Sequence, residues 1–110
     1  MSKRSKACDI SQKVKKAVWE RDNHRCIICG SSYAMPNAHY ISRAQGGLGI
    51  EENIVTLCMD CHNKYDNGDS RASIGYRIQS YLNSCYEDWT EEKLIYSKWG
   101  NINGRLDKDT

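Results

Sequence analysis

The apolar positions of this chain follow helical spacing near its two ends and strand-like spacing in its middle. Residues 11–21 place their apolar side chains on one helix face, and Ser11 is suited to cap the start of that helix. Two more helices are expected in the last third of the chain. They are marked by Ile74, Ile78, Tyr81 and Leu82 on one face, and by Thr90 followed by Leu94, Ile95 and Trp99.

The middle of the chain predicts a strand, a loop, a second strand and a helix. Residues 38–41 alternate as a short strand does, and residues 53–57 are rich in β-branched side chains. Between them, residues 46–49 contain three glycines and predict a flexible loop. A helix is expected from Met59 to about Asn67, where Gly68 ends it.

Composition indicates a small domain with a thin apolar core. The chain has 110 residues, of which 39% are hydrophobic and none is Phe. The first residues are polar and basic rather than an apolar signal segment, and no run is long enough to cross a bilayer, so a cytoplasmic protein without membrane contact is expected. We expect a disordered basic arm at 1–10, a core at 11–68 and a helical extension at 69–110.

Four of the six cysteines form two C-x-x-C pairs, Cys26 with Cys29 and Cys58 with Cys61. Such pairs are typical of a tetrahedral structural zinc site, and a reducing compartment favours metal over disulfides. Binding of Zn²⁺ would also supply folding free energy that a thin core lacks. Cys8 and Cys85 have no paired neighbour and are expected to be ordinary thiols.

The histidine after the last cysteine is expected to face away from this zinc site. Successive side chains on a helix diverge by about 100°, so His62 cannot easily join the tetrahedron that Cys61 completes. It should instead point toward the two strands, where His39 can meet it. The sequence therefore predicts a second group of polar ligands separate from the cysteines.

Charge is concentrated at the amino-terminal end. Residues 1–25 carry eight Lys or Arg and three acidic residues, whereas the remainder carries eight and eleven. A basic segment of this kind suits contact with a polyanion, and Lys13, Lys15 and Lys16 are its candidate DNA contacts. A solvated helix face is the alternative explanation for these lysines.

The ordered set of these residues resembles the HNH nuclease family. The resemblance is carried by residues 38–41, the glycines 46–47, residues 53–58 and residues 61–63, with the knuckle 26–29 matching the zinc-stapled branch. It implies a small α+β domain of the ββα-metal fold that hydrolyses DNA phosphodiester bonds with one divalent ion. Compact, free-standing examples of this kind resemble phage or prophage proteins, so phage packaging proteins are possible partners of a monomer or weak dimer.

The resemblance also implies roles for individual residues. His39 matches the general base, Asn53 the asparagine that pins the loop and orients this base, and His62 a ligand of the catalytic ion, Mg²⁺ or another divalent transition ion. Arg43 is placed to hold a neighbouring phosphate through its planar fork. The glycine loop is expected to let the backbone approach DNA closely.

One position departs from the family pattern. Ala38 stands where an Asp or His usually supplies another metal ligand. Asp66, one helical turn after His62, Tyr40 or water is expected to fill the gap. A second register would make His39 the ligand and Tyr40 the base, although the distance from Ala38 to the glycine pair favours His39 as base. The alternative functions are a zinc-stabilised module that binds DNA or a packaging protein without cutting, and a structural zinc domain that docks a protein partner.

Overall fold

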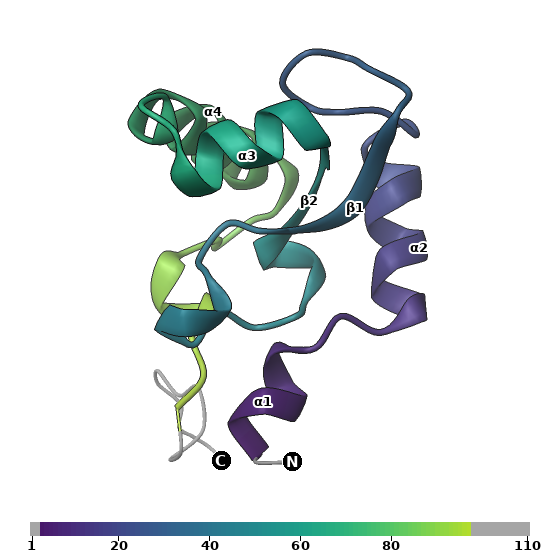
Figure 1. The fold of residues 1–110 in the computed structure, drawn as a ribbon. Coiled ribbons are helices and arrows are strands. Elements are labelled where there is room, and N and C mark those ends of the chain that lie inside the picture. The colour runs from purple at the N-terminus through teal and green to yellow at the C-terminus, as the bar shows by residue number, and fades with distance from the viewer. Residues whose placement is uncertain (1–2, 98–110) are drawn as a thin grey trace.

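The computed structural model describes residues 3–97 as a two-stranded hairpin surrounded by helices (Figure 1). The helices and strands are α1 (Lys3–Cys8), α2 (Gln12–Arg21), β1 (Ala34–His39), β2 (Ile54–Cys58), α3 (Met59–Asn67) and α4 (Arg71–Cys85). Three short 3₁₀ turns complete the order, η1 (Arg43–Gln45) and η2 (Glu51–Asn53) between the strands and η3 (Glu91–Leu94) after α4. This is the small α+β, ββα arrangement that the sequence predicts.

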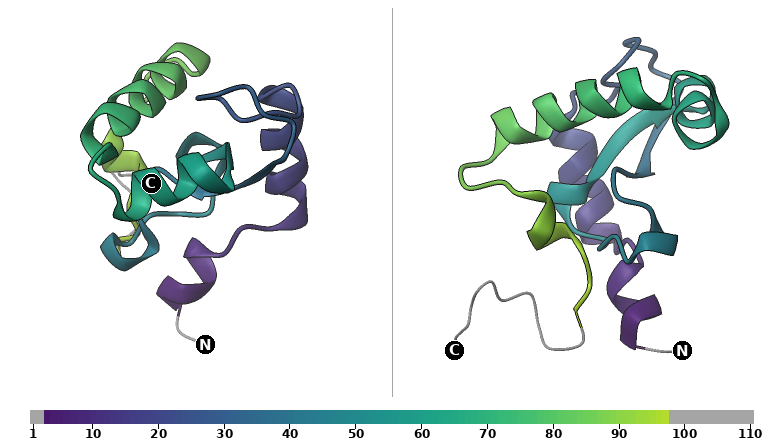
Figure 2. Two further views of the ribbon diagram at one scale, coloured as in Figure 1. Left: turned by 45° about the horizontal axis from the view of Figure 1, so that its top comes forward. Right: turned by 90° about the vertical axis from the view of Figure 1, so that its left-hand side faces the viewer.

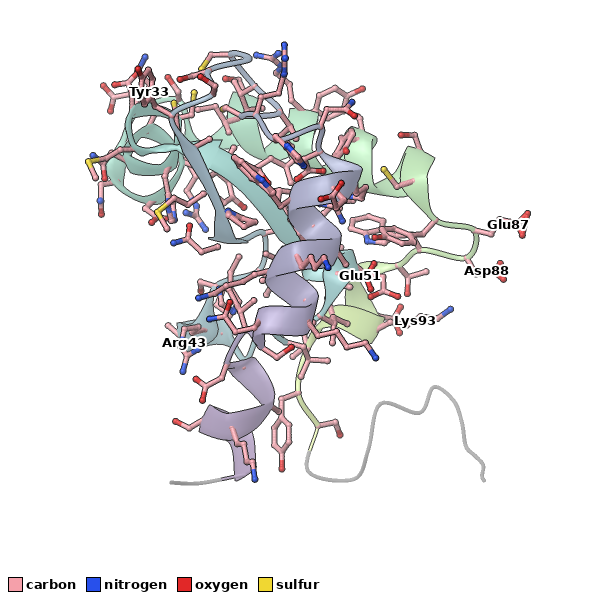
Figure 3. The ribbon with its side chains drawn as sticks, turned by 90° about the vertical axis from the view of Figure 1, so that its right-hand side faces the viewer. Tyr33, Arg43, Glu51, Glu87, Asp88 and Lys93 are labelled. Atoms are coloured by element: carbon pink, nitrogen blue, oxygen red, sulfur yellow. The ribbon has the colours of Figure 1, made fainter. Side chains whose placement is uncertain are left out.

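The hairpin β1–β2 is antiparallel and carries helices on both faces. Met35 pairs with Leu57 and Ala38 with Val55, and a bulge interrupts the register between these pairs. Helix α2 covers one face, whereas α3 and α4 cover the other (Figures 1 and 3). Strand β1 begins four residues earlier than expected. The bulge accommodates Pro36, which has no N–H to donate to the neighbouring strand. Because proline is unusual inside a strand, the sequence does not indicate that β1 begins before it.

The core lies between the hairpin and the helices α3 and α4. The strands contribute Ala38, Val55 and Leu57, and the helices contribute Tyr65, Ile74, Ile78 and Leu82. The helical face expected for α4 is confirmed, because its three aliphatic members are buried at 5% exposure or less. The pair of cysteines at the start of α3 belongs to the same cluster, so the metal-ligand region and the core are continuous.

An ion pair at the end of α2 fastens that helix to the rest of the domain. The Nε of Arg21 lies 2.7 Å from the Oδ1 of Asp22, and the Asp22 side chain is fully buried. The Asp22 carboxylate also accepts from the backbone N–H of Thr56 at 2.8 Å and from the hydroxyl of Tyr81 at 2.6 Å. Arg21 donates to the carbonyl of Ile54 at 2.7 Å. These bonds satisfy both charges and join α2, β2 and α4.

From residue 3 on, the amino-terminal segment is ordered, contrary to the disordered arm expected at 1–10. Residues 3–8 form α1, and Cys8 is 2% exposed. The backbone N–H of Gly49 donates to the carbonyl of Ala7 at 3.0 Å, which ties the end of α1 to the loop between the strands. Local sequence gives little helical signal here, and the tertiary contact supplies the order.

The glycine loop is held on two sides by the protein itself. After α4 the chain returns toward the end of the molecule that carries α1 (Figure 2). There Leu48 donates to the carbonyl of Leu94 at 2.8 Å and Tyr96 donates to that of Gly46 at 2.7 Å. A Cβ on Gly47 would lie 1.7 Å from the carbonyl oxygen of Ile41. The glycine at 47 therefore allows close packing within the protein, and the approach of this loop to DNA stays a prediction.

The last expected helix is only a short turn. The turn η3 ends at Leu94, and Trp99 lies outside the described residues. No helix within residues 3–97 has the length and apolar character needed to span a membrane.

Candidate functional site

The four paired cysteines converge at one end of the hairpin. Cys26 and Cys29 lie in the connection between α2 and β1, Cys58 ends β2, and Cys61 lies in the first turn of α3. Their sulfur atoms all lie within 4.8 Å of one another, and those of Cys29 and Cys58 are 3.5 Å apart. A tetrahedral zinc ion with Zn–S bonds of about 2.3 Å separates its ligands by about 3.8 Å. The four cysteines therefore fit a metal ion such as zinc, as predicted.

The surroundings of these sulfur atoms also suit a cation. Burial alone would raise the pKa of Cys26, but backbone N–H groups of Cys29, Cys58 and Ile28 outweigh it and lower this pKa to about 7. Burial raises the pKa of Cys61, and the neighbouring thiols Cys58 and Cys26 raise it further. Four ionised sulfurs at these distances repel one another unless a positive ion lies between them. The chemistry of the group thus matches the expected structural Zn²⁺.

His62 does not join the cysteines but faces a separate polar cleft. This cleft has a volume of about 540 Å³ and lies between the end of β1, the turn η1 and the helix α3. The charged and titratable side chains that line it are His39, Arg43, His62, Asp66 and Arg71. The structure therefore brings His39 and His62, which the sequence singles out, to the same cleft. This cleft is separate from the cysteine cluster.

His39 is held at the edge of this cleft by the end of α1. Its Nε2 lies 2.9 Å from the carbonyl oxygen of Cys8, which can only accept a hydrogen bond. Burial lowers the pKa of His39 below 6.5, and the positive charges of Arg43 and of protonated His62 lower it further. The Cys8 hydrogen bond and Asp66 act in the opposite direction. The net effect keeps the ring neutral at pH 7, the form that can accept a proton.

Asn53 is fully buried and fastens the loop that follows β1. Its Oδ1 accepts from the backbone N–H of Ile41 at 2.8 Å. Its Nδ2 donates to the carbonyl of Ile41 at 3.1 Å and to that of Leu48 at 2.9 Å. The hydrogen bond that the His39 ring makes is to Cys8, so the amide of Asn53 shapes the loop, and any influence on the histidine passes through the backbone.

Arg43 lies beside the junction of α1 and α2 (Figure 3). One of its nitrogens donates to the Cys8 carbonyl at 2.9 Å, and another forms an ion pair with Asp9 at 2.8 Å. Half of this side chain remains exposed, at 47%. The guanidinium is thus at the cleft, where a phosphate could bind, and is partly neutralised by the chain's own carboxylate.

His62 and Asp66 form a pair on one face of α3. The Nε2 of His62 lies 3.1 Å from the Asp66 carboxylate, at the i, i+4 spacing that the sequence suggests. Imidazole nitrogen and carboxylate oxygen are suitable ligands for a divalent transition ion. Among the His, Cys, Asp and Glu side chains of residues 3–97, however, the four cysteines are the only group of three or more whose ligand atoms lie close enough to share one metal ion. A cation held by the pair would therefore take its other ligands from water or substrate.

Neither the position of the missing ligand, Ala38, nor the candidate Tyr40 lines the cleft. Ala38 is 0% exposed and packs in the core opposite Val55. Tyr40 points to a different groove, where its hydroxyl donates to Glu91 and its ring contacts Trp89. Burial raises the pKa of Tyr40, and Glu91 raises it further. The register that makes Tyr40 the general base is therefore not supported by the geometry.

Two groups of basic residues differ in their relation to the cleft. Lys13, Lys15 and Lys16 lie on α2, and none of them lines the cleft of His39 and His62. Arg71, at the start of α4, does line it, and its guanidinium lies 4.7 Å from the ring centre of Tyr65. The sequence gives no sign of Arg71, which lines the cleft, or of Asp9 and the Cys8 carbonyl, which contact Arg43. All three lie outside the motif and carry no pattern of their own.

Comparison with known proteins places this site within a described family. A family model described as HNH endonuclease matches residues 26–68, which include the four cysteines, both cleft histidines and Asn53. A protein named Anaredoxin from Nostoc sp. (strain PCC 7120 / SAG 25.82 / UTEX 2576) is 31% identical over 64 residues. The aligned part covers 57% of this chain and 84% of that protein. No solved structure gives a significant match.

Proposed function

Because the chain belongs to the HNH endonuclease family, we propose that it is a metal-dependent endonuclease that hydrolyses phosphodiester bonds of DNA. The observation that carries the proposal is the cleft in which His39 at the end of β1 meets His62 and Asp66 of α3. One neutral imidazole, one metal-ligand pair and two arginines then surround a space of about 540 Å³. These groups can supply the general base, the metal site and the phosphate contacts that metal-dependent phosphodiester hydrolysis uses.

Each group has a role that follows from its chemistry. His39 takes a proton from the attacking water as the water oxygen bonds to phosphorus and the bond to the 3′ oxygen breaks. Arg43 and Arg71 bind phosphate oxygens and orient the strand. His62 and Asp66 hold a divalent ion, which when bound supplies Lewis-acid stabilisation of charge on the phosphate and on the leaving 3′ oxygen. Mg²⁺ and Mn²⁺ are the first ions to test.

The cysteine cluster has a structural role in this proposal. Four cysteine ligands close the coordination sphere of zinc, and a closed site has no position for substrate. The ion would join the connection after α2 to the start of α3, on which His62 lies. The zinc ion and the catalytic ion would therefore act at separate places, one on folding and the other on DNA.

A second function is favoured by one observation, the burial of Ala38. A buried methyl group at this position gives the catalytic ion no third protein ligand. The chain would then bind DNA, or a phage packaging protein, without cutting it. In that case DNA binding would be salt-sensitive and would depend on Lys13, Lys15 and Lys16 rather than on His39.

A plasmid cleavage assay separates the two functions. Zinc-loaded protein is incubated with supercoiled DNA across a panel of divalent ions, and we expect nicking that His39→Ala lowers by about 10²- to 10⁴-fold. His24→Ala is the matched control, since His24 stacks on Trp19 and does not line the cleft. Intact plasmid under every ion, together with retained salt-sensitive binding, would establish the second function instead.

A further inference from the structure

The carbonyl oxygen at the end of α1 accepts hydrogen bonds from two side chains of the cleft. The Nε2 of His39 and a guanidinium nitrogen of Arg43 both lie 2.9 Å from the oxygen of Cys8. Cys8 lies outside the region that the family model matches, which begins at residue 26. A segment remote in sequence therefore touches both the base and the phosphate-binding candidate of the motif.

This contact determines where the proton of the neutral His39 ring resides. A carbonyl oxygen has no proton to give, so Nε2 must carry the hydrogen. In the neutral ring the other nitrogen, Nδ1, then holds the free lone pair. We propose that the end of α1 is a positioning element of the active site, in which the Cys8 carbonyl fixes the His39 ring so that Nδ1 accepts the proton from water.

The end of α1 that positions His39 is also expected to weaken the binding of DNA. Asp9 forms an ion pair with Arg43 at 2.8 Å, so its carboxylate competes with a DNA phosphate for that guanidinium. Removing the segment from the cleft would therefore release Arg43 while it frees the ring of His39. Loss of catalytic rate together with unchanged or tighter DNA binding is a combination that general destabilisation does not produce.

The structure offers two ways to displace this segment. A Cβ on Gly49 would lie 2.0 Å from the carbonyl oxygen of Asp9 and 3.0 Å from that of Cys8, so Gly49→Ala pushes the segment away from the loop. Cys8 is 2% exposed, and Cys8→Lys would place an unpaired ammonium there, which leaves only when the segment lifts off. The second variant leaves the loop backbone unchanged and serves if the first does not fold.

The proposal rests on the proposed endonuclease function for its kinetic part only. With saturating DNA and metal, we expect both variants to lower kcat by about 10- to 100-fold, because small misplacements of a catalytic group have effects of this size. DNA affinity, measured without the catalytic ion by fluorescence anisotropy, should stay constant or rise by about two- to fivefold as Arg43 is released. A parallel loss of kcat and affinity would show a merely structural role and overturn the proposal.

The ring itself can be observed whether or not the protein cuts DNA. With ¹⁵N-labelled histidine, the nitrogen chemical shifts of His39 in the zinc-loaded protein should report a single tautomer protonated at Nε2. In both displaced variants they should move toward the average of two exchanging tautomers, whereas Asp9→Asn should leave them unchanged. A proton on Nδ1 in the native protein, or ring shifts in both displaced variants that are unchanged from those of the native protein, would refute the assignment. Absence of cleavage with the expected ring shifts would instead count against the proposed function alone.

Discussion

Replacing Asn53 by alanine removes the side chain that shapes the loop beside His39. The amide is fully buried and makes three hydrogen bonds, to both backbone groups of Ile41 and to the carbonyl of Leu48. Alanine keeps the β-carbon but leaves all three backbone groups without this partner. The loop then loses its side-chain link to the start of β2, and only the backbone bond from Tyr40 to the carbonyl of residue 53 remains.

The size of the effect follows from how well water can replace the amide. A fully buried N–H without a partner costs about 1–3 kcal/mol, and we expect the N–H of the half-buried Ile41 to fall within this range. The two carbonyls lie on half-buried residues and each keeps a second lone pair, so we expect a smaller loss there. Together we expect Asn53→Ala to lower the free energy of unfolding by about 3 kcal/mol, a large share of the about 5–15 kcal/mol typical of a domain.

Urea denaturation at saturating zinc measures this loss. With a slope of about 1.5 kcal/mol per molar, the midpoint should fall by about 2 M, and cleavage should fall with it because the loop carries Arg43. Asn63→Ala is the matched control, since Asn63 is exposed on α3 and should change stability by less than about 0.5 kcal/mol. Equal midpoints for the two variants would show that the amide does not hold the loop.

Zinc binding, the ionisation of His39 and the burial of Ala38 lead to four further predictions. Cys61→Ala should abolish stoichiometric zinc binding and much of the folded structure, whereas Cys85→Ala, exposed and outside the cluster, should not; metal analysis and circular dichroism decide this. The pKa of His39 lies below 6.5 in the folded protein, so its neutral form persists below that pH and single-turnover cleavage should begin to fall only there; a midpoint above 6.5 would contradict the assignment. Because this pKa is lower in the folded protein, His39 of the unfolded chain is protonated at a higher pH than His39 of the folded chain. The contribution of this residue to the free energy of unfolding should therefore decrease as the pH drops through 6.5. Ala38→Asp should destabilise the zinc-loaded protein by several kcal/mol when no other divalent ion is present, and added Mn²⁺ should restore stability; a melting temperature indifferent to Mn²⁺ would show that position 38 does not reach the ion.

The parts of the fold that could be predicted are those specified by short-range patterns. The C-x-x-C pairs fix two turns around one ion, and the spacing from Cys58 to His62 fixes which side chains share a helix face. Both arguments need only local geometry, and the cysteine cluster and the separate position of His62 follow from them. The helix capped by Ser11 was predictable for the same reason, since its hydroxyl accepts from Val14 within one turn.

The parts that were missed depend on contacts between distant segments. Helix α1 carries no strong local signal, and its order comes from Gly49 and from the side chains of His39 and Arg43. The expected freedom of the glycine loop was wrong in a related way. Glycines allow many conformations in isolation, but here their missing side chains let other parts of the backbone approach closely. Sequence shows that glycine is needed, and only the fold shows what it approaches.

The backbone hydrogen bonds of the glycine loop matter for any attempt to transplant this HNH module into another protein. The loop is fastened by Ala7 on one side and by Leu94 and Tyr96 on the other, all of them outside the segment 26–68 that defines the family. A graft limited to that segment would carry the histidines and cysteines but leave both fastenings behind. A useful cassette should therefore extend from residue 7 to residue 96, because the family signature marks the chemistry but not everything that keeps it in shape.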